Sequence, residues 1–257
     1  SQTEKMKILA KLQDFLNAKA AHYESLSFIE DDPIKIPHLF SAKEDIEIIA
    51  LLAATIAWGN RKSIIKSATK IAEFLDYQPA QFVKEHRDSD LKALPHFVHR
   101  TFMREDLQFF LQAMQNIYLT KGGLENAFYH KEGLKQGIEQ WRNWMLETPH
   151  AKRSEKHLAN PAKNSAAKRI NMYLRWMVRP ASKGVDFGLW KKIKPSDLYC
   201  PLDVHSGRVA RKLALLTRQA NDWKAAEELR LALVSLDESD PVKYDFALFG
   251  LGVYEKF

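Results

Sequence analysis

The stretch EDIEIIALLAATIAW, residues 44–58, is apolar around nearly the whole circumference of a helix. A helix with this pattern is buried on all sides, which places it at the centre of a core. The pair Gly59-Asn60 ends the stretch, and from Arg61 apolar residues recur every three or four positions, as on one face of a helix. These residues therefore predict a protein built from helices.

Helical periodicity continues outward in both directions. Predicted helices cover residues 4–21, 61–75, 79–83, 91–94, 106–118, 134–146, 165–178, 206–216, 222–234 and 241–254. The last begins with Asp240-Pro241, an N-cap followed by the proline favoured at the first helical position. Residues 147–164 are polar, rich in lysine and aperiodic, which predicts a disordered loop.

No stretch predicts a strand, so the predicted fold class is all-α. We expect a single helical unit over residues 1–257, with one approximate lobe of residues 40–150 and another of residues 1–39 together with 151–257.

Composition narrows the classes of function. No apolar run approaches the ~18 residues that a membrane-spanning helix needs, and the polar N-terminal stretch lacks a signal-peptide core, so we expect a cytoplasmic protein. The single cysteine, Cys200, excludes an internal disulfide, a cysteine-based zinc site and a four-cysteine iron–sulfur cluster. The nine histidines show no metal-binding spacing. We therefore predict no metal, no cofactor and no membrane partner, and we expect a monomer.

Positive charge is concentrated in one segment. The chain carries 39 Lys and Arg against 32 Asp and Glu, a net charge of +7. Residues 151–180 contain eight of the cations and one acid, Glu155, which accounts for the whole excess. Such a segment is typical of binding to a phosphate backbone, although a solvated face with a flexible loop has the same composition.

The predicted helix that starts at residue 165 carries a cationic stripe. Lys168, Arg175 and Arg179 are spaced by seven and four residues, so they share one helical face. Like charges at this spacing repel each other unless an anion lies opposite them. The stripe therefore either faces the phosphates of a nucleic acid, or it is solvated or paired in internal salt bridges. If Lys168 is half-buried beside other cations, its lowered pKa makes the amine a nucleophile.

In the segment that follows, Gly184 and Gly188 bracket Val185-Asp186-Phe187, and Trp190 and several lysines come after the second glycine. Phe187 and Trp190 either stack on a displaced base or pin the loop to the core. Asp186 is either a second functional carboxylate or a partner in a cap or salt bridge. Lys191 and Lys192 continue the positive charge.

Asp203 lies in the stretch PLDVHSGRVAR, residues 201–211, immediately before a predicted amphipathic helix. As an N-cap, its carboxylate can accept a hydrogen bond from the backbone amide of Ser206. Beside a nucleic-acid surface, the same carboxylate can stabilise a sugar cation while a base is removed. The cations Arg208 and Arg211 on that helix face either phosphates or water.

The stretch PLDVHSGRVARKLALL, residues 201–216, resembles the segment of helix-hairpin-helix DNA glycosylases (endonuclease III-like enzymes) that reads Val/Leu-Asp-Thr-His-x-x-Arg-Val-x-x-Arg. Asp203, His205 and Arg208 fall on that pattern, whereas Val204 replaces the usual Thr. The order of helices between residues 45 and 253 is similar to that superfamily, through an uncharacterised bacterial family distantly related to it.

The sequence departs from the superfamily in three respects. No LPGVG-like hairpin string occurs, so the resemblance implies a two-lobed, glycosylase-like fold with a degenerate or missing hairpin motif. The cysteines of the iron–sulfur cluster are also missing. The lysine of bifunctional members lies a short helix before the Asp, whereas Lys168 lies 35 residues before Asp203 (203 − 168). Archaeal 8-oxoguanine glycosylases also separate the two widely, and Lys168 is similar to their catalytic lysine in helix order.

The resemblance implies a DNA glycosylase, with or without lyase activity at abasic sites, that acts on a flipped damaged base such as an oxidised purine in double-stranded DNA. Asp203 and Lys168 would be catalytic; if Lys168 is structural, Asp203 activates water and only the base is removed. Predicted DNA contacts are Lys163, Arg169, Arg175, Arg179, Lys191, Lys192, Arg208 and Arg211. The predicted base pocket comprises Trp58, Asn60, Arg61, Asp186, Phe187, Trp190 and His205.

Two other classes of protein fit the same residues. One is a non-catalytic DNA- or RNA-binding protein on this scaffold. The other is a helical protein–protein adaptor whose basic stripe is only surface.

Overall fold

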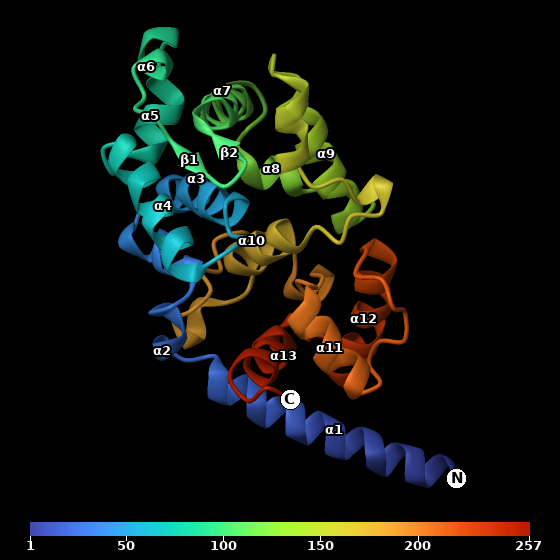
Figure 1. The fold of residues 1–257 in the computed structure, drawn as a ribbon. Helices are drawn as coiled ribbons and strands as arrows, with labels where there is room; N and C mark the ends of the chain where they lie inside the picture. Colours follow the sequence, from blue (N-terminus) through green and yellow to red (C-terminus); the bar gives the residue numbers. More distant parts are fainter. The chain divides into compact units, whose positions relative to one another are not determined.

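The computed structural model describes all of residues 1–257 and confirms that the fold is all-α (Figure 1). The chain divides into two compact units, one of Ser1–Phe28 with Lys163–Phe257 and the other of Ile29–Ala162. The predicted lobes have the same discontinuous pattern, with boundaries after residues 39 and 150 in place of residues 28 and 162.

The unit of Ile29–Ala162 contains α3 (Lys43–Thr55), the helix predicted from the apolar stretch. Its residues from Ile46 to Thr55 are buried, including Glu47, whose Oε1 accepts a hydrogen bond from the Tyr118 hydroxyl at 3.3 Å. The other helices of this unit before residue 147 are η1 (Pro33–Lys35), η2 (Pro37–Leu39), α4 (Arg61–Phe74), α5 (Pro79–Glu85), α6 (Asp88–Lys92), α7 (Arg104–Thr120), α8 (Leu124–Phe128) and α9 (Leu134–Leu146).

This unit also contains a hairpin that the sequence did not predict. Strand β1 (Val98–His99) pairs antiparallel with β2 (Phe102–Met103). Each strand has two residues, which is too short for the alternation of apolar and polar residues that marks a strand.

The prediction of a disordered loop over residues 147–164 is wrong. This segment forms two short helices, η3 (Lys152–His157) and η4 (Pro161–Lys163). The fully buried Asp106 of α7 holds η3, because its Oδ1 accepts hydrogen bonds from Arg153 at 2.7 Å and from Ser154 at 2.5 Å. A tertiary anchor therefore orders a segment that has no periodicity of its own.

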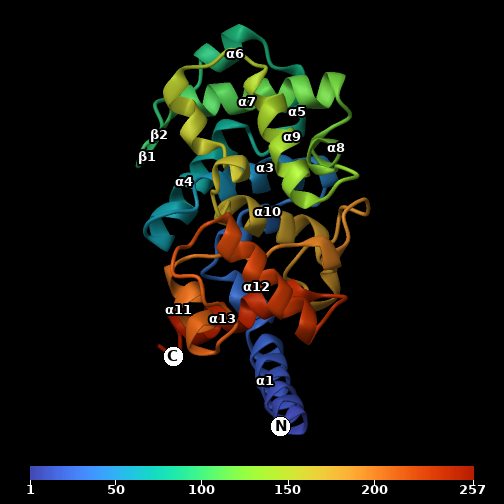
Figure 2. The same ribbon diagram turned by 90° about the vertical axis from the view of Figure 1, so that its right-hand side faces the viewer.

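The other unit joins the two ends of the chain. Helix α13 (Tyr244–Val253) packs against α1 (Gln2–Tyr23) and α11 (Val204–Lys212) (Figure 2). Gly250 permits the close approach of α1, since an added Cβ would lie 2.2 Å from the Tyr23 ring. The remaining elements are α2 (Leu26–Ile29), α10 (Lys168–Val178), η5 (Ala181–Lys183), η6 (Pro195–Asp197), α12 (Trp223–Leu236) and η7 (Pro241–Lys243).

The core of this unit draws on α1 and on the chain after residue 200. Leu16, Val209, Leu229 and Leu248 are fully buried in one apolar cluster. No helix anywhere in the chain combines the length and the apolar character needed to cross a membrane.

Candidate functional site

Lys168 is the first residue of α10, and polar contacts hold the turn before it. Ala167 has a φ of 52°, in the left-handed region, and its N–H donates to Ser165 Oγ at 3.1 Å. Asn171 donates from Nδ2 to the Ala166 carbonyl at 3.1 Å. The helix therefore begins three residues later than predicted, with the Lys168 ammonium at its N-terminus.

Asp203 is the N-cap of α11. Its Oδ1 accepts hydrogen bonds from the backbone N–H groups of His205 at 2.9 Å and Ser206 at 3.0 Å. In return, the Asp203 N–H donates to Ser206 Oγ at 2.9 Å, which completes a capping box. The cap interpretation of Asp203 is confirmed. The His205 side chain is exposed, and its role in a base pocket stays a prediction.

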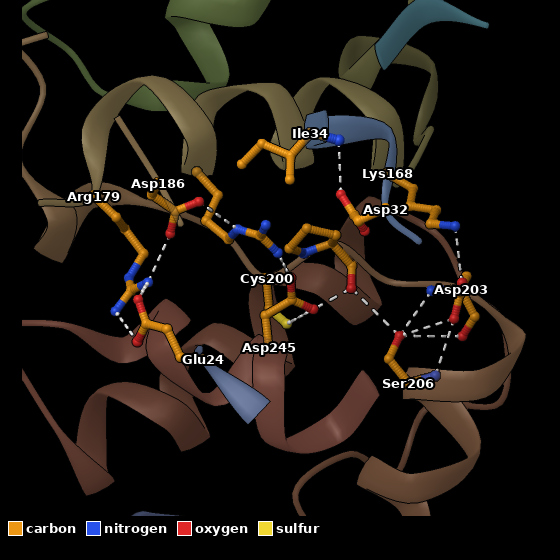
Figure 3. A network of polar contacts seen from close by, with 12 residues as sticks. Glu24, Asp32, Ile34, Lys168, Arg179, Asp186, Cys200, Asp203, Ser206 and Asp245 are labelled. Carbon is orange, nitrogen blue, oxygen red and sulfur yellow. Dashed lines mark hydrogen bonds and ion pairs between the residues drawn. The ribbon is translucent and has the colours of Figure 1, made fainter. Parts of the chain in front are cut away.

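The second oxygen of Asp203 contacts the other predicted catalytic residue. Its Oδ2 lies 2.9 Å from Nζ of Lys168 (Figure 3). The Lys168 and Asp203 side chains are 41% and 27% exposed, so solvent reaches both. Burial is the largest effect on the pKa of Asp203 and raises it, but Lys168 and the Ser206 hydrogen bonds together outweigh it, so the pKa lies below its usual value. The contact therefore has the geometry of an ion pair, and its surroundings favour the charged form of the Asp203 carboxylate.

An accessible lysine–aspartate pair can take part in nucleophilic and acid–base reactions. Once the lysine gives up its proton, the pair offers a nucleophilic amine in direct contact with a carboxyl group that can carry the proton. Cap and ion pair coexist because each uses a different oxygen of the Asp203 carboxylate. No group of three or more His, Cys, Asp or Glu side chains is arranged to hold a metal ion.

The prediction that Arg175 contacts DNA is wrong. Its side chain is 4% exposed and sits between two carboxylates. Nε donates to Asp186 Oδ1 at 3.1 Å, and Nη1 donates to Asp245 Oδ2 at 2.7 Å. At this position the cationic stripe therefore points into the interior of the unit, where carboxylates from other segments neutralise its charge.

The prediction for Arg179 is wrong for the same reason. This guanidinium is also 4% exposed, and it donates to Asp186 Oδ2 at 2.7 Å, Glu24 Oε2 at 2.8 Å and Asp240 Oδ2 at 2.8 Å (Figure 3 shows the first two). Asp240 makes no cap bond with its side chain, contrary to prediction, because its carboxylate is engaged by Arg179. The internal salt bridges that the sequence left as an alternative are confirmed for both arginines.

The loop after α10 is pinned to the core. Trp190 is 1% exposed and packs against the Tyr173 ring, with centroids 5.5 Å apart, so its prediction as a base-stacking residue is wrong. Asp186 is equally buried in its ion pairs, which rules out the predicted contact with a flipped base. Phe187 is half-buried and donates its N–H to the Trp176 carbonyl at 2.8 Å. Its role in a base pocket stays a prediction.

The three lysines predicted to bind DNA are on the surface. Lys163, Lys191 and Lys192 are exposed, and Lys191 Nζ donates to the Gly188 carbonyl at 2.8 Å. Their contact with a phosphate backbone stays a prediction.

The three arginines predicted to bind DNA beside these lysines are half-buried. Arg208 Nη2 donates to the Gly252 carbonyl at 3.0 Å, and Arg211 Nε donates to the Arg218 carbonyl at 2.8 Å. Burial lowers the pKa of Arg169. Arg208 and Arg211 thus have structural contacts already, and DNA binding by the three stays a prediction.

Three predicted base-pocket residues, Trp58, Asn60 and Arg61, belong to the unit of Ile29–Ala162. Asn60 is the N-cap of α4, with Oδ1 accepting the Ser63 N–H at 3.2 Å. The Trp58 ring meets the His99 ring edge-on, with centroids 5.2 Å apart. Their pocket role stays a prediction.

The sequence did not predict the roles of three buried polar residues in the same unit as the ion pair, Ser206, Cys200 and Asp245. Ser206 was considered only for its amide, and its hydroxyl completes the capping box. Cys200 Sγ lies 3.6 Å from Asp245 Oδ1, and burial, the largest effect on each, raises the pKa of both groups. Nothing local marks Asp245 for this position, because it follows Asp203 by 42 residues (245 − 203).

These observations define a mostly helical protein with an accessible lysine–aspartate pair in one of its two compact units. The chain belongs to a family described as protein of unknown function (DUF2400), whose family model matches residues 32–254. The matched range includes both members of the pair. Comparisons with curated proteins and with solved structures found no match.

Proposed function

We propose that the protein is a DNA glycosylase of the base-excision-repair type with associated lyase chemistry. It would act on a damaged base, such as an oxidised purine, flipped out of double-stranded DNA. The observation that carries the proposal is the 2.9 Å contact between Lys168 Nζ and Asp203 Oδ2, the two residues that the resemblance implies are catalytic. The proposal includes a monomeric protein in the cytoplasm.

The reaction needs a nucleophile and a group that handles protons and positive charge. The neutral amine of Lys168 attacks C1′ of the sugar, the bond from C1′ to the base breaks, and the base leaves with the bonding electrons and then takes up a proton. Asp203 takes the proton that frees the Lys168 amine and passes it to the departing base. The carboxylate restored in this way stabilises the positive charge that develops on the sugar and accepts the proton released from the attacking nitrogen. Opening of the sugar ring gives a Schiff base, from which the neighbouring phosphate is eliminated.

The ionic state of the pair sets a condition on this reaction. Lys168 is not a nucleophile while its ammonium is paired with the Asp203 carboxylate, so a proton must move first. Excluding water favours the neutral form of both partners, because desolvation disfavours charge. Bound DNA that covers the half-exposed pair would therefore promote the proton transfer that activates the amine.

DNA binding in this proposal rests on the exposed lysines Lys163, Lys191 and Lys192 and on the net charge of +7. Each phosphate neutralised by a lysine releases counterions, so affinity should fall steeply with salt. A protein–protein adaptor would show almost no such slope.

Borohydride trapping tests the chemistry. Wild-type protein is mixed with duplexes that hold 8-oxoguanine or an abasic site, and borohydride reduces any Schiff base to a stable adduct. We expect an adduct with the wild type, none with Lys168→Ala, and an unchanged yield with the control Lys183→Ala, which removes an exposed lysine of the same unit. An adduct that survives Lys168→Ala contradicts the assignment of the nucleophile.

Base release is scored in the same reactions. Release that survives Lys168→Ala but not Asp203→Asn would make the protein a glycosylase without lyase activity. If wild-type protein binds the duplexes but releases no base and forms no adduct, it is a non-catalytic DNA-binding protein.

A further inference from the structure

We infer that Ser206 is a positioning residue that holds the Asp203 carboxylate with one oxygen turned to Lys168. This inference deepens the proposed function and rests on it for its chemical meaning. Ser206 is the third residue of α11 and is only 4% exposed, and the ion pair with Lys168 is made by Asp203.

The Ser206 hydroxyl is surrounded by acceptors. It accepts the Asp203 N–H at 2.9 Å, which leaves its own hydrogen to donate. Asp203 Oδ1 lies 3.2 Å from Ser206 Oγ, the Pro201 carbonyl 3.3 Å, and the Asp203 carbonyl 3.5 Å. A single hydrogen serves three acceptors, and the closest is the carboxylate oxygen.

The consequence is that the two oxygens of Asp203 are not equivalent. Three donors converge on Oδ1: the N–H groups of His205 and Ser206 and the Ser206 hydroxyl. Oδ2 faces Lys168 Nζ (Figure 3). A proton that leaves the lysine therefore arrives at Oδ2, because the lone pairs of Oδ1 are already taken by donors.

The hydroxyl can be separated from the rest of the cap. Ser206→Ala removes only Oγ and keeps both backbone N–H bonds to Oδ1, so α11 retains its N-cap. The hydroxyl stabilises the charged carboxylate, and without it Asp203 should hold a proton to a higher pH.

The test is a pH titration of the Asp203 side chain by carbon NMR in the intact protein. Ser206→Ala should move the titration midpoint upward by about half a pH unit, a modest effect because the carboxylate is partly solvated. Ser206→Thr, which restores a hydroxyl, should return the midpoint toward the wild-type value. The control Ala210→Gly weakens α11 without touching Asp203 and should leave the midpoint in place.

The same variants are then compared in borohydride trapping against pH. The acid limb of the Ser206→Ala profile should move upward by the same interval, since Asp203 must be deprotonated to accept a proton. An unchanged NMR midpoint in Ser206→Ala overturns the inference. If the wild type forms no adduct, the proposed function fails, and the titration alone still decides the role of Ser206.

Discussion

The two roles of Asp203, helix cap and ion-pair partner, can be separated by substitution because each uses a different oxygen. Asp203→Asn keeps an oxygen for the cap and removes the charge, whereas Asp203→Ala removes both. Lys168→Met removes only the ion pair and keeps most of the apolar stem. We predict that the three variants lose stability in the order Ala, Asn, Met, with Ala the most destabilised.

The magnitudes follow from the geometry. Losing an N-cap costs about 1 kcal/mol, and Asn caps nearly as well as Asp. The ion pair joins side chains that are 41% and 27% exposed, so screening limits it to about 0.2–1 kcal/mol. A carboxylate at the start of α11 gains a further ~0.3–1 kcal/mol from the helix dipole. Asp203→Asn should therefore cost about 1 kcal/mol and Asp203→Ala about 2 kcal/mol.

Lys168→Met should be almost neutral. The ammonium stands at the N-terminus of α10, where the helix dipole disfavours a cation by about 0.3–1 kcal/mol, so its removal offsets the lost ion pair. A loss of activity in Lys168→Met could then not be attributed to unfolding.

Urea unfolding followed by circular dichroism measures these differences at pH 7, and again in acid. Because the pKa of Asp203 is lowered in the folded protein, its contribution is present above the unfolded value of about 3.9 and is lost as the pH falls through the folded value. The gap between wild type and Asp203→Asn should accordingly narrow as the pH falls below the unfolded value. If Asp203→Asn costs as much as Asp203→Ala at pH 7, the separation of cap and charge is wrong.

Three further predictions rest on other parts of the same unit. Arg179→Met should destabilise the protein by about 3–5 kcal/mol in urea unfolding, because it leaves buried carboxylates without their counter-charge; a cost below about 1 kcal/mol would contradict the buried network. The thiol of Cys200 should react with a disulfide reagent such as DTNB only after unfolding, since burial raises its pKa well above the ordinary value; rapid labelling of native protein would contradict this. The double variant Lys191→Ala/Lys192→Ala should reduce the salt slope of duplex binding by up to about 2, whereas Lys183→Ala should leave it unchanged; equal slopes for both would remove these two lysines from the interface.

Most of the fold could be predicted because helical periodicity is a local signal. The stretch of residues 44–58 predicted α3, and every residue from Ile46 to Thr55 is indeed buried. The predictions that failed concern segments whose structure depends on contacts with distant parts of the chain. Strands of two residues carry no pattern, and η3 is held by Asp106, which lies 46 residues before the start of that helix (152 − 106).

The candidate site divides in the same way. The resemblance implies that Lys168 and Asp203 are catalytic partners, and in the fold the two side chains lie 2.9 Å from each other. The helical spacing of Arg175 and Arg179 was interpreted correctly as a shared face, yet that face points inward. Periodicity says which residues lie together on a helix but not whether the facing surface is water or a carboxylate from a distant segment.

The sequence by itself determined the helical class, the concentration of positive charge in residues 151–180 and the capping chemistry at Asp203, because each depends on neighbours within a few turns. Only the tertiary structure decided which cations remain at the surface and which are neutralised inside. That decision depends on Glu24, Asp240 and Asp245, which reach α10 from the two ends of the chain. Which carboxylate pairs with a given arginine depends on their distance in the folded chain, and the periodicity of the sequence does not contain that distance.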